Sequence, residues 1–394
     1  MKVGLGFSTN VASGDAAAEA TAAAVSPLNG RPAGLALVFA SPHHANAAED
    51  VLDALQDAAS PAATIGCVSE AIVAGSRELE GEPAISVWIS DIEGAQTFHM
   101  QFSRTESGGV FSGWLFDRAE DGAAAPVHLL IADPYSFPVD HLLAHLNESA
   151  PGTVVVGGMA STGTARGETI LFHDRSIHRN GAVGVRLPSS INVRTFVSQG
   201  CRPIGDSYVV TRAEQNVLYG LGGRPPLERL RETVSAMAPP DRELVSRGVH
   251  LGQAIDEYRP QHGIGDFLIR GVIGADPDSG AVAVGDAVDV GQTVQFHVRD
   301  AATADEELRS LLERQSAELP GEPAGALLFT CNGRGSRMFP TPDHDAELVS
   351  KHFGGVPVAG FFCAGELGPV GGKNFLHGFT ASAAVFVDQG ERSS

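Results

Sequence analysis

The sequence is poor in cysteine, and it has no long apolar runs. Its 394 residues hold four cysteines, no two of which form a C-x-x-C pair, so a disulfide framework is excluded. No apolar run approaches the roughly 18 residues that a membrane-spanning helix needs. The first residues also lack the apolar stretch of a secretory signal. These absences predict a cytoplasmic protein without membrane insertion.

Positive charge and familiar cofactor motifs are also scarce. Lysine and arginine number 27 against 47 acidic residues, which gives a formal net charge of −20. Such a surface repels the phosphates of nucleic acids and of anionic membranes, so neither is expected as a partner. Lys2–Asn10 carries only two glycines of a dinucleotide fingerprint, and no Walker A, H-E-x-x-H or G-x-S-x-G motif occurs.

Glycine is plentiful, with 47 residues, and the chain repeats one order of strands and helices. Three stretches each predict an apolar strand, an amphipathic helix, a second strand with a glycine turn, and a third strand. The first strands are Gly34–Ser41, Val127–Pro134 and Gly325–Asn332. The second strands are Ala62–Cys67, Val154–Gly158 and Val356–Phe361. The third strands are Ala84–Ile89, Ala182–Leu187 and Ser382–Phe386.

The similar spacing from the first strand to the glycine turn favours a β-α-β-β unit that is used three times. In such a unit the first two strands are parallel neighbours with a right-handed crossover, and the third strand can return antiparallel. The predicted fold class is therefore α/β of the mixed α+β kind, with repeated units in mixed sheets covered by helices. The glycines at the turns either line a site or allow strands to approach closely.

A region of different pattern lies between the second and third units. Between Asn192 and Asp300 the sequence predicts several short strands and a helix over Leu227–Met237. A further helix is expected over Thr303–Leu319, opened by a capping box at Thr303. Because 394 residues exceed one ordinary domain, we expect two domains, 1–194 and 195–394. A boundary near residue 222 is the alternative.

The loop Cys331–Phe339 is the richest candidate site. Its glycines allow backbone N–H groups to turn inward, and its two arginines offer forks that match carboxylate or phosphate. The loop follows a strand, where α/β proteins commonly bind ligands. The alternative is a solvated loop with structural glycines. The candidate residues are Cys331, Asn332, Gly333, Arg334, Gly335 and Arg337.

A second cluster lies at the glycine turns of the third and first units. Glycines flank Glu366, which could present its carboxylate to a ligand. A thiol nucleophile would need a nearby base, and a buried cysteine is normally an inert small hydrophobe. The candidate residues are Cys363, Gly365, Glu366 and His377 in the third unit, and Gly66, Cys67 and Ser69 in the first.

Two histidines on the predicted helix of the second unit have the spacing of metal ligands. His141 and His145 lie one helical turn apart, a spacing that suits a shared metal ion. Leu142, Leu143 and Leu146 mark the apolar face of this helix. The histidines are therefore expected on the solvated face, and no metal site is predicted.

Several segments spread over most of the chain resemble the FIST family, in which a FIST N-terminal domain precedes a FIST C domain. These segments are Gly66–Ala71 (GCVSEA), the turn Gly157–Gly158, Arg179–Val185 (RNGAVGV), Ser198–Thr211 (SQGCRPIGDSYVVT), Leu221–Leu230, Arg270–Val290, Cys331–Gly335 (CNGRG) and Gly360–Pro369.

The resemblance implies an intracellular sensor that binds a small ligand, such as an amino acid, and signals through a separate output protein. It implies neither catalytic residues nor a required cofactor. A zwitterionic ligand would suit Arg334 or Arg337 through its carboxylate and Glu366 through its amine. The alternatives are a haem-binding nitric oxide sensor, a cysteine-dependent enzyme using Cys331 or Cys363, and a scaffold that binds a partner without a ligand.

Overall fold

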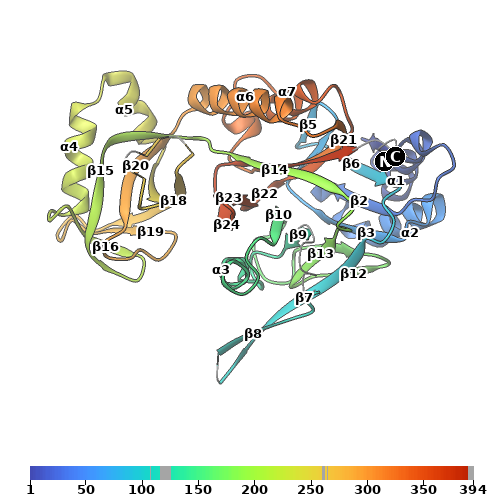
Figure 1. The fold of residues 1–394 in the computed structure, drawn as a ribbon, viewed down its shortest axis with the longest axis horizontal. Helices are drawn as coiled ribbons and strands as arrows, with labels where there is room; N and C mark the ends of the chain where they lie inside the picture. The colour runs from blue at the N-terminus through green and yellow to red at the C-terminus, as the bar shows by residue number, and fades with distance from the viewer. Residues whose placement is uncertain (107, 116–125, 260–261, 264, 389–394) are drawn as a thin grey trace. The chain divides into compact units, whose positions relative to one another are not determined.

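The chain forms two compact units. The computed structural model describes residues 1–106, 108–115, 126–259, 262–263 and 265–388. One unit combines Met1–Val197, Leu311–Leu376 and Thr380–Ser394, and the other combines Ser198–Ser310 with His377–Phe379 (Figure 1). The third repeat thus folds with the first two, and the second unit is inserted within it. The predicted domains 1–194 and 195–394 do not coincide with these compact units. They remain a prediction of where the N-terminal and C-terminal family domains divide.

All three predicted repeats are present in the first unit, each enlarged by an outer strand and a hairpin. The first repeat contains β1 (Val3–Ser8), α1 (Ser13–Val25), β2 (Leu35–Ala40), α2 (Ala48–Ala59), β3 (Ala63–Val68), β4 (Ala71–Ala74), β5 (Arg77–Glu80) and β6 (Ile85–Ser90). The second contains β7 (Gln96–Thr105), β8 (Gly108–Ser112), β9 (Val127–Ala132), α3 (Val139–Ser149), β10 (Val154–Met159), β11 (Leu171–His173), β12 (Ser176–His178) and β13 (Ala182–Arg186). The third contains β14 (Asn192–Ser198), β21 (Glu322–Cys331), α7 (His344–His352), β22 (Val358–Cys363), β23 (Glu366–Val370), β24 (Lys373–His377) and β25 (Ala381–Asp388).

Strand pairing inside each repeat agrees with the sequence. The first and second strands are parallel neighbours in β2–β3, β9–β10 and β21–β22. The closing strands β6, β13 and β25 run antiparallel to the first strands. The three sheets have the orders β1-β6-β2-β3-β11-β12, β24-β23-β10-β9-β13-β7-β8 and β14-β25-β21-β22-β4-β5. The mixed α+β fold class is confirmed.

The hairpins between the second and closing strands were not predicted, and each one joins another repeat's sheet. The hairpin β4–β5 of the first repeat pairs with β22 of the third. The hairpin β11–β12 of the second pairs with β3 of the first, and β23–β24 of the third pairs with β10 of the second. The three repeats therefore exchange hairpins in a cycle, and each sheet contains strands of two repeats.

The repeated glycines on the second strands have a steric cause. A Cβ atom at Gly66, Gly157 or Gly360 would lie 1.9, 2.0 or 1.7 Å from a carbonyl oxygen of the neighbouring first strand. No side chain fits at such distances, so only glycine lets these parallel strands pack at this register. Of the two interpretations, the structure supports close strand approach at these positions.

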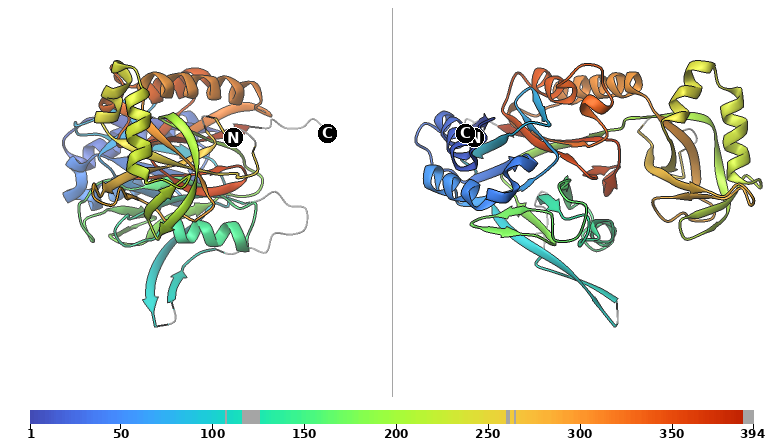
Figure 2. Two further views of the ribbon diagram at one scale, coloured as in Figure 1. Left: turned by 90° about the vertical axis from the view of Figure 1, so that its left-hand side faces the viewer. Right: turned by 180° about the vertical axis from the view of Figure 1, so that it is seen from behind.

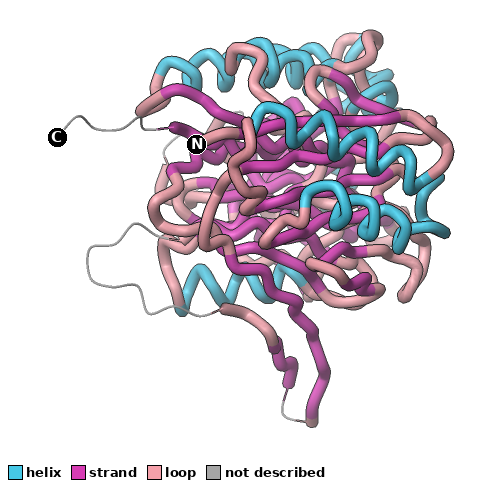
Figure 3. Tube along the Cα trace, turned by 90° about the vertical axis from the view of Figure 1, so that its right-hand side faces the viewer, coloured by secondary structure: helices cyan, strands magenta, loops and turns pink. Residues whose placement is uncertain are grey.

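The inner faces of the three sheets share one hydrophobic core. Phe39 of the first sheet, Ile131 of the second, and Phe329 and Phe361 of the third all belong to it. The helices α1 and α2 cover the outer face of the first sheet, and α3 covers the second. Figure 3 shows helices lying outside the strands. Because β2 is buried on both faces, every one of its residues is apolar.

The second unit is a closed barrel with the strand order β15-β16-β19-β18-β17-β20. Its elements are β15 (Cys201–Glu214), β16 (Val217–Leu221), α4 (Pro226–Ala236), α5 (Pro239–Ser246), β17 (Val249–Ala254), β18 (Phe267–Ala275), β19 (Val282–Val284) and β20 (Thr293–Arg299). The chain leaves it through α6 (Ala301–Ala317). The predicted capping box at Thr303 is wrong: the helix begins earlier, and Asp300 Oδ1 accepts a hydrogen bond of 3.1 Å from the Ala302 N–H.

Within the described residues, no helix combines the length and the apolar character needed to cross a membrane.

Candidate functional site

The structure brings most of the predicted site residues to the strand ends of the third sheet. Cys331 ends β21 and Cys363 ends β22, and the two are register partners. All four cysteines are buried. Burial raises the pKa of the Cys67 thiol to about 12. Burial, together with the charge of Glu366, raises the pKa of Cys363 well above its usual range. These two thiols are therefore protonated at neutral pH and are poor nucleophiles.

Arg334 is fully buried and binds a carboxylate of its own chain. Its Nε and Nη2 atoms donate to Oδ2 and Oδ1 of Asp345 at 2.6 and 2.9 Å. The Thr330 hydroxyl donates to the same carboxylate at 2.7 Å, and the Phe339 ring faces the guanidinium at 5.1 Å. Asp345 therefore occupies the fork that we expected to bind a ligand carboxylate.

Glu366 is also buried, and one of its two carboxyl oxygens is engaged within the protein, whereas Oε1 has no hydrogen-bond partner among the described residues. Its Oε2 atom accepts hydrogen bonds from the N–H and the hydroxyl of Thr380 at 3.1 and 2.8 Å. Burial outweighs these bonds and raises the pKa of Glu366 to about 8. A protonated acid is a poor partner for a ligand amine. His377 is buried at the end of β24 and is grouped with the barrel unit.

The exposed part of the Cys331–Phe339 loop is held by the exchanged hairpin of the first repeat. Arg337 forms an ion pair with Glu70 and donates to the Asn332 carbonyl at 3.0 Å. The Ser336 N–H and hydroxyl both donate to Glu80. Gly335 adopts a φ of +56°, which explains the glycine there. The contacts of Arg337 and Ser336 therefore connect the third repeat with the first.

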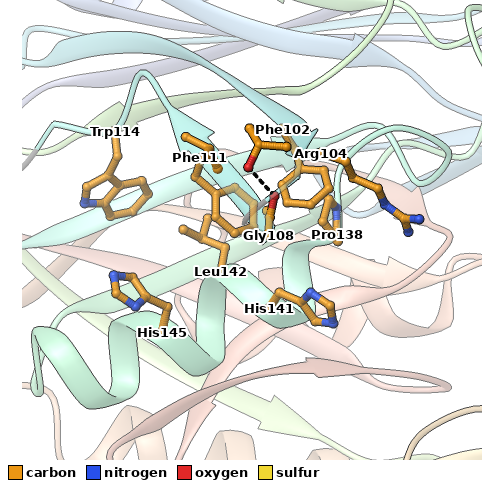
Figure 4. Close-up of a pocket in the computed structure, with 12 residues that line it drawn as sticks. Phe102, Arg104, Gly108, Phe111, Trp114, Pro138, His141, Leu142 and His145 are labelled. Atoms are coloured by element: carbon orange, nitrogen blue, oxygen red, sulfur yellow. Dashed lines mark hydrogen bonds between the residues drawn. The ribbon is translucent and has the colours of Figure 1, made fainter.

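A cavity of about 750 Å³ lies elsewhere in the first unit, between the β7–β8 hairpin and α3. Figure 4 shows Phe111 and Trp114 on one side, with Leu142 and His145 of α3 across from them. We call this cavity the aromatic chamber. It is lined by Phe102, Arg104, Thr105, Gly108, Gly109, Val110, Phe111, Trp114, Pro138, His141, Leu142 and His145.

Local sequence explains how the chamber wall forms. Phe102 of β7 and Phe111 of β8 are cross-strand partners, and their ring centroids lie 5.0 Å apart. The Thr105 hydroxyl closes the hairpin by donating to the Gly108 carbonyl at 2.8 Å. A Cβ at Gly109 would lie 2.5 Å from the Phe102 ring, so glycine leaves room for the aromatic side chain. The hairpin extends from the strands of its unit (Figure 2).

Trp114, which lines the chamber, belongs to a stack of aromatic rings whose other members do not line it. The Trp114 indole stacks on His128 at 4.5 Å and meets Phe98 edge-on at 5.3 Å. Burial lowers the pKa of His128 to about 4, so this imidazole is neutral at pH 7 and behaves as an aromatic surface. The lining itself offers the apolar faces of Phe102, Phe111 and Trp114 to a ligand.

The sequence interpretation did not identify this chamber. His141 and His145 are exposed, as predicted from the leucine face, and the described residues contain no group of metal-ligating side chains suited to a metal ion. One usable signal was present: Trp114 is one of only two tryptophans in the sequence. The hairpin that places it opposite α3 could not be recognised without the structure.

Comparison with known proteins identifies relatives along nearly the whole chain. A family model for the FIST N domain matches residues 34–224, and one for the FIST C domain matches residues 226–369. An uncharacterized protein of Mycobacterium tuberculosis (strain H37Rv) is 55% identical over 388 residues, covering 98% of this chain and all of the relative. An uncharacterized protein of Mycobacterium bovis is 50% identical over 391 residues, covering 99% of this chain and all of the relative. The chain therefore belongs to the FIST family, with a FIST N domain followed by a FIST C domain.

Proposed function

We propose that this protein is a cytoplasmic sensor that binds a small molecule in the aromatic chamber and signals through a separate output protein. FIST domains are generally associated with sensing and signal transduction. The observation that supports the proposal is the chamber itself. Its volume of about 750 Å³ falls within the usual range of small-molecule pockets, and its walls are aromatic and aliphatic with a few polar groups at the edge.

The chamber is a better supported ligand site than the Cys331–Arg337 and Glu366 cluster. Arg334 already binds Asp345. Glu366 is buried, and its raised pKa keeps the carboxyl group mostly protonated at neutral pH. A ligand carboxylate that used this fork of Arg334 would have to displace Asp345. Releasing the buried Asp345 from its guanidinium would cost about 3–5 kcal/mol.

The same geometry favours binding over thiol chemistry. A cysteine-dependent enzyme that used Cys363 would need a thiolate near pH 7, whereas burial raises the pKa of this thiol well above its usual range. The chamber, in contrast, requires no reactive group to hold an apolar ligand.

A ligand screen tests the proposal. Small aromatic and aliphatic compounds are added to the purified protein, and thermal unfolding and tryptophan fluorescence are recorded. A ligand at 100 times its Kd should stabilise the protein by about 2.7 kcal/mol. It should also change the emission of Trp114, because this indole lines the chamber whereas Trp88 is fully buried in the core. Trp114→Phe should abolish the fluorescence change.

A matched pair of variants on α3 locates the binding site. His145→Trp places a bulky ring in the chamber, and Ala144→Trp places the same ring on an exposed position of α3 that does not line it. Binding should be lost in the first variant and kept in the second. Equal binding by both variants, or no stabilising compound at all, would refute the chamber as the ligand site.

A further inference from the structure

A second recess adjoins the aromatic chamber and shares Phe102, Arg104 and Pro138 with it. Its volume is about 610 Å³. Unlike the chamber, it is rich in polar groups, and we call it the arginine recess. Its remaining lining residues are Ser103, Pro134, Tyr135, Ser136, Phe137 and Arg166.

The charge of this double cavity is opposite to that of the protein. The chain has a formal net charge of −20, yet none of the described residues that line the chamber or the recess is acidic. Arg104 and Arg166 both line the recess. In a strongly acidic protein, two guanidinium groups without lining carboxylates form a local site of positive potential.

The two arginines are exposed and not engaged in ion pairs with any described residue. Some other arginines of this unit have acidic partners, such as Arg31 with Asp91 and Arg337 with Glu70. A guanidinium fork matches the geometry of a carboxylate or phosphate and can bind either one with two hydrogen bonds. Arg104 and Arg166 are therefore available to an external anion.

The wall behind the arginines is held by internal hydrogen bonds. Asp133 is fully buried and accepts hydrogen bonds from the hydroxyls of Ser136 and Thr169. Tyr135 donates its hydroxyl hydrogen to the Gly163 carbonyl at 2.9 Å. This network orders the loop before α3 and leaves its one carboxylate facing inward. An anion in the recess would thus meet the two arginines beside a wall that internal hydrogen bonds already order.

We propose that the ligand is a small amphiphilic anion. Its apolar chain or ring occupies the aromatic chamber, and its carboxylate or phosphate is bound in the arginine recess by Arg104 and Arg166. This inference rests on the proposed function, since it assigns a chemical class to the ligand of the same chamber. Arg104 lines both cavities, so a single ligand can span them.

A series of probes with one tail and different head groups tests the charge requirement. Decanoate, decyl phosphate, decanol and decyltrimethylammonium are titrated below their micelle concentrations by calorimetry, with inorganic phosphate alone as a further probe. The two anions should bind at least about tenfold more tightly than decanol, as expected for charge-assisted hydrogen bonds. The cation should bind more weakly than decanol. Inorganic phosphate should bind much more weakly than decyl phosphate, because it lacks the tail.

Charge-neutralising variants identify the head-group site. Arg104→Gln and Arg166→Gln should each weaken decanoate binding about tenfold and leave decanol binding unchanged. The control is Arg175→Gln, which makes the same charge change at an exposed position outside both cavities. The anion preference should also diminish at high salt, because salt screens exposed charges.

The outcomes separate this inference from the proposed function. Equal binding of decanol, decanoate and the cation, or an unchanged decanoate affinity in both arginine variants, would overturn the anionic ligand while the chamber remained the site. If inorganic phosphate binds as tightly as decyl phosphate, the tail has no role and the amphiphile is refuted. Binding of no member of the series would count against both proposals.

Discussion

At the scale of single residues, the chain itself occupies part of the cluster that first suggested a ligand site, while Oε1 of Glu366 and Oδ1 of Asn332 are buried without a hydrogen-bond partner among the described residues. Arg334 carries the fork that suits a carboxylate, and Asp345, at the start of α7, supplies that carboxylate. The neighbouring hairpin residue Glu78 accepts hydrogen bonds from the N–H groups of Asp345 and Ala346. The sequence does not identify Asp345 as the partner of Arg334, because the two residues meet only through the fold.

The buried acid Glu366 predicts a pH dependence of stability. Its pKa is raised to about 8 in the folded protein, against about 4.3 for an unfolded glutamate. The folded state therefore holds a proton that the unfolded state releases. This stabilisation is complete below about pH 4 and is lost as pH rises through 8, with a limiting slope of about 1.4 kcal/mol per pH unit.

The measurement is the unfolding temperature between pH 5 and 8.5. The wild-type value should fall across this range, and Glu366→Gln should flatten the fall, because a neutral amide replaces the protonated acid. Some slope should remain, since burial also raises the pKa of Glu78. Glu148→Gln, at an exposed position of α3, should behave like wild type. An unchanged slope in the Glu366 variant would contradict the prediction.

At the scale of elements, the repeated glycines follow from the distance between parallel strands. The sequence showed glycine at matching places in three units, and two explanations were open. Contacts of 1.7–2.0 Å between a hypothetical Cβ and the neighbouring strand decide for a steric role. Each sheet contains strands of two repeats. A substitution at one of these glycines would therefore disturb strands of two repeats.

Gly360→Ala should therefore be strongly destabilising. Its Cβ would lie 1.7 Å from the Leu328 carbonyl oxygen, and β21 and β22 would have to separate. We expect a loss of at least about 2 kcal/mol or a failure to fold. Gly14→Ala in α1 is the control, because its Cβ would meet nothing closer than 4.0 Å and alanine favours a helix. Chemical denaturation of both variants measures the difference, and a Gly360 variant as stable as wild type would disprove the steric explanation.

At the scale of the whole molecule, all three sheets belong to one unit and the barrel is an insertion. The first unit contains every strand pair that joins two repeats. It also contains the aromatic chamber and the arginine recess. The barrel has a core of its own, which includes Leu218, Val282 and Phe296. The first unit should therefore fold and bind ligand without the barrel.

Excision of Gln199–Ser310, replaced by a short Gly/Ser linker, tests this independence. Phe379→Gly is added, because Phe379 packs with barrel residues and its φ of +63° suits glycine. The shortened chain should unfold cooperatively and keep the Trp114-dependent ligand response of the full chain. A shortened chain that folds but no longer binds would show that the barrel contributes to the site, and an unfolded one would show that the units depend on each other.

The sequence by itself determined the three β-α-β-β repeats, the mixed sheets and the family. Apolar periodicity and glycine placement are local, so each repeat can be recognised within its own segment. Only the tertiary structure decided which sheet each hairpin joins, as with Ile72 beside Phe361. It also decided that Arg334 binds Asp345, and that a β-hairpin and a helix enclose the chamber around Trp114. These features depend on contacts between distant segments, and the identity of a partner across space is not encoded in the pattern of either segment alone.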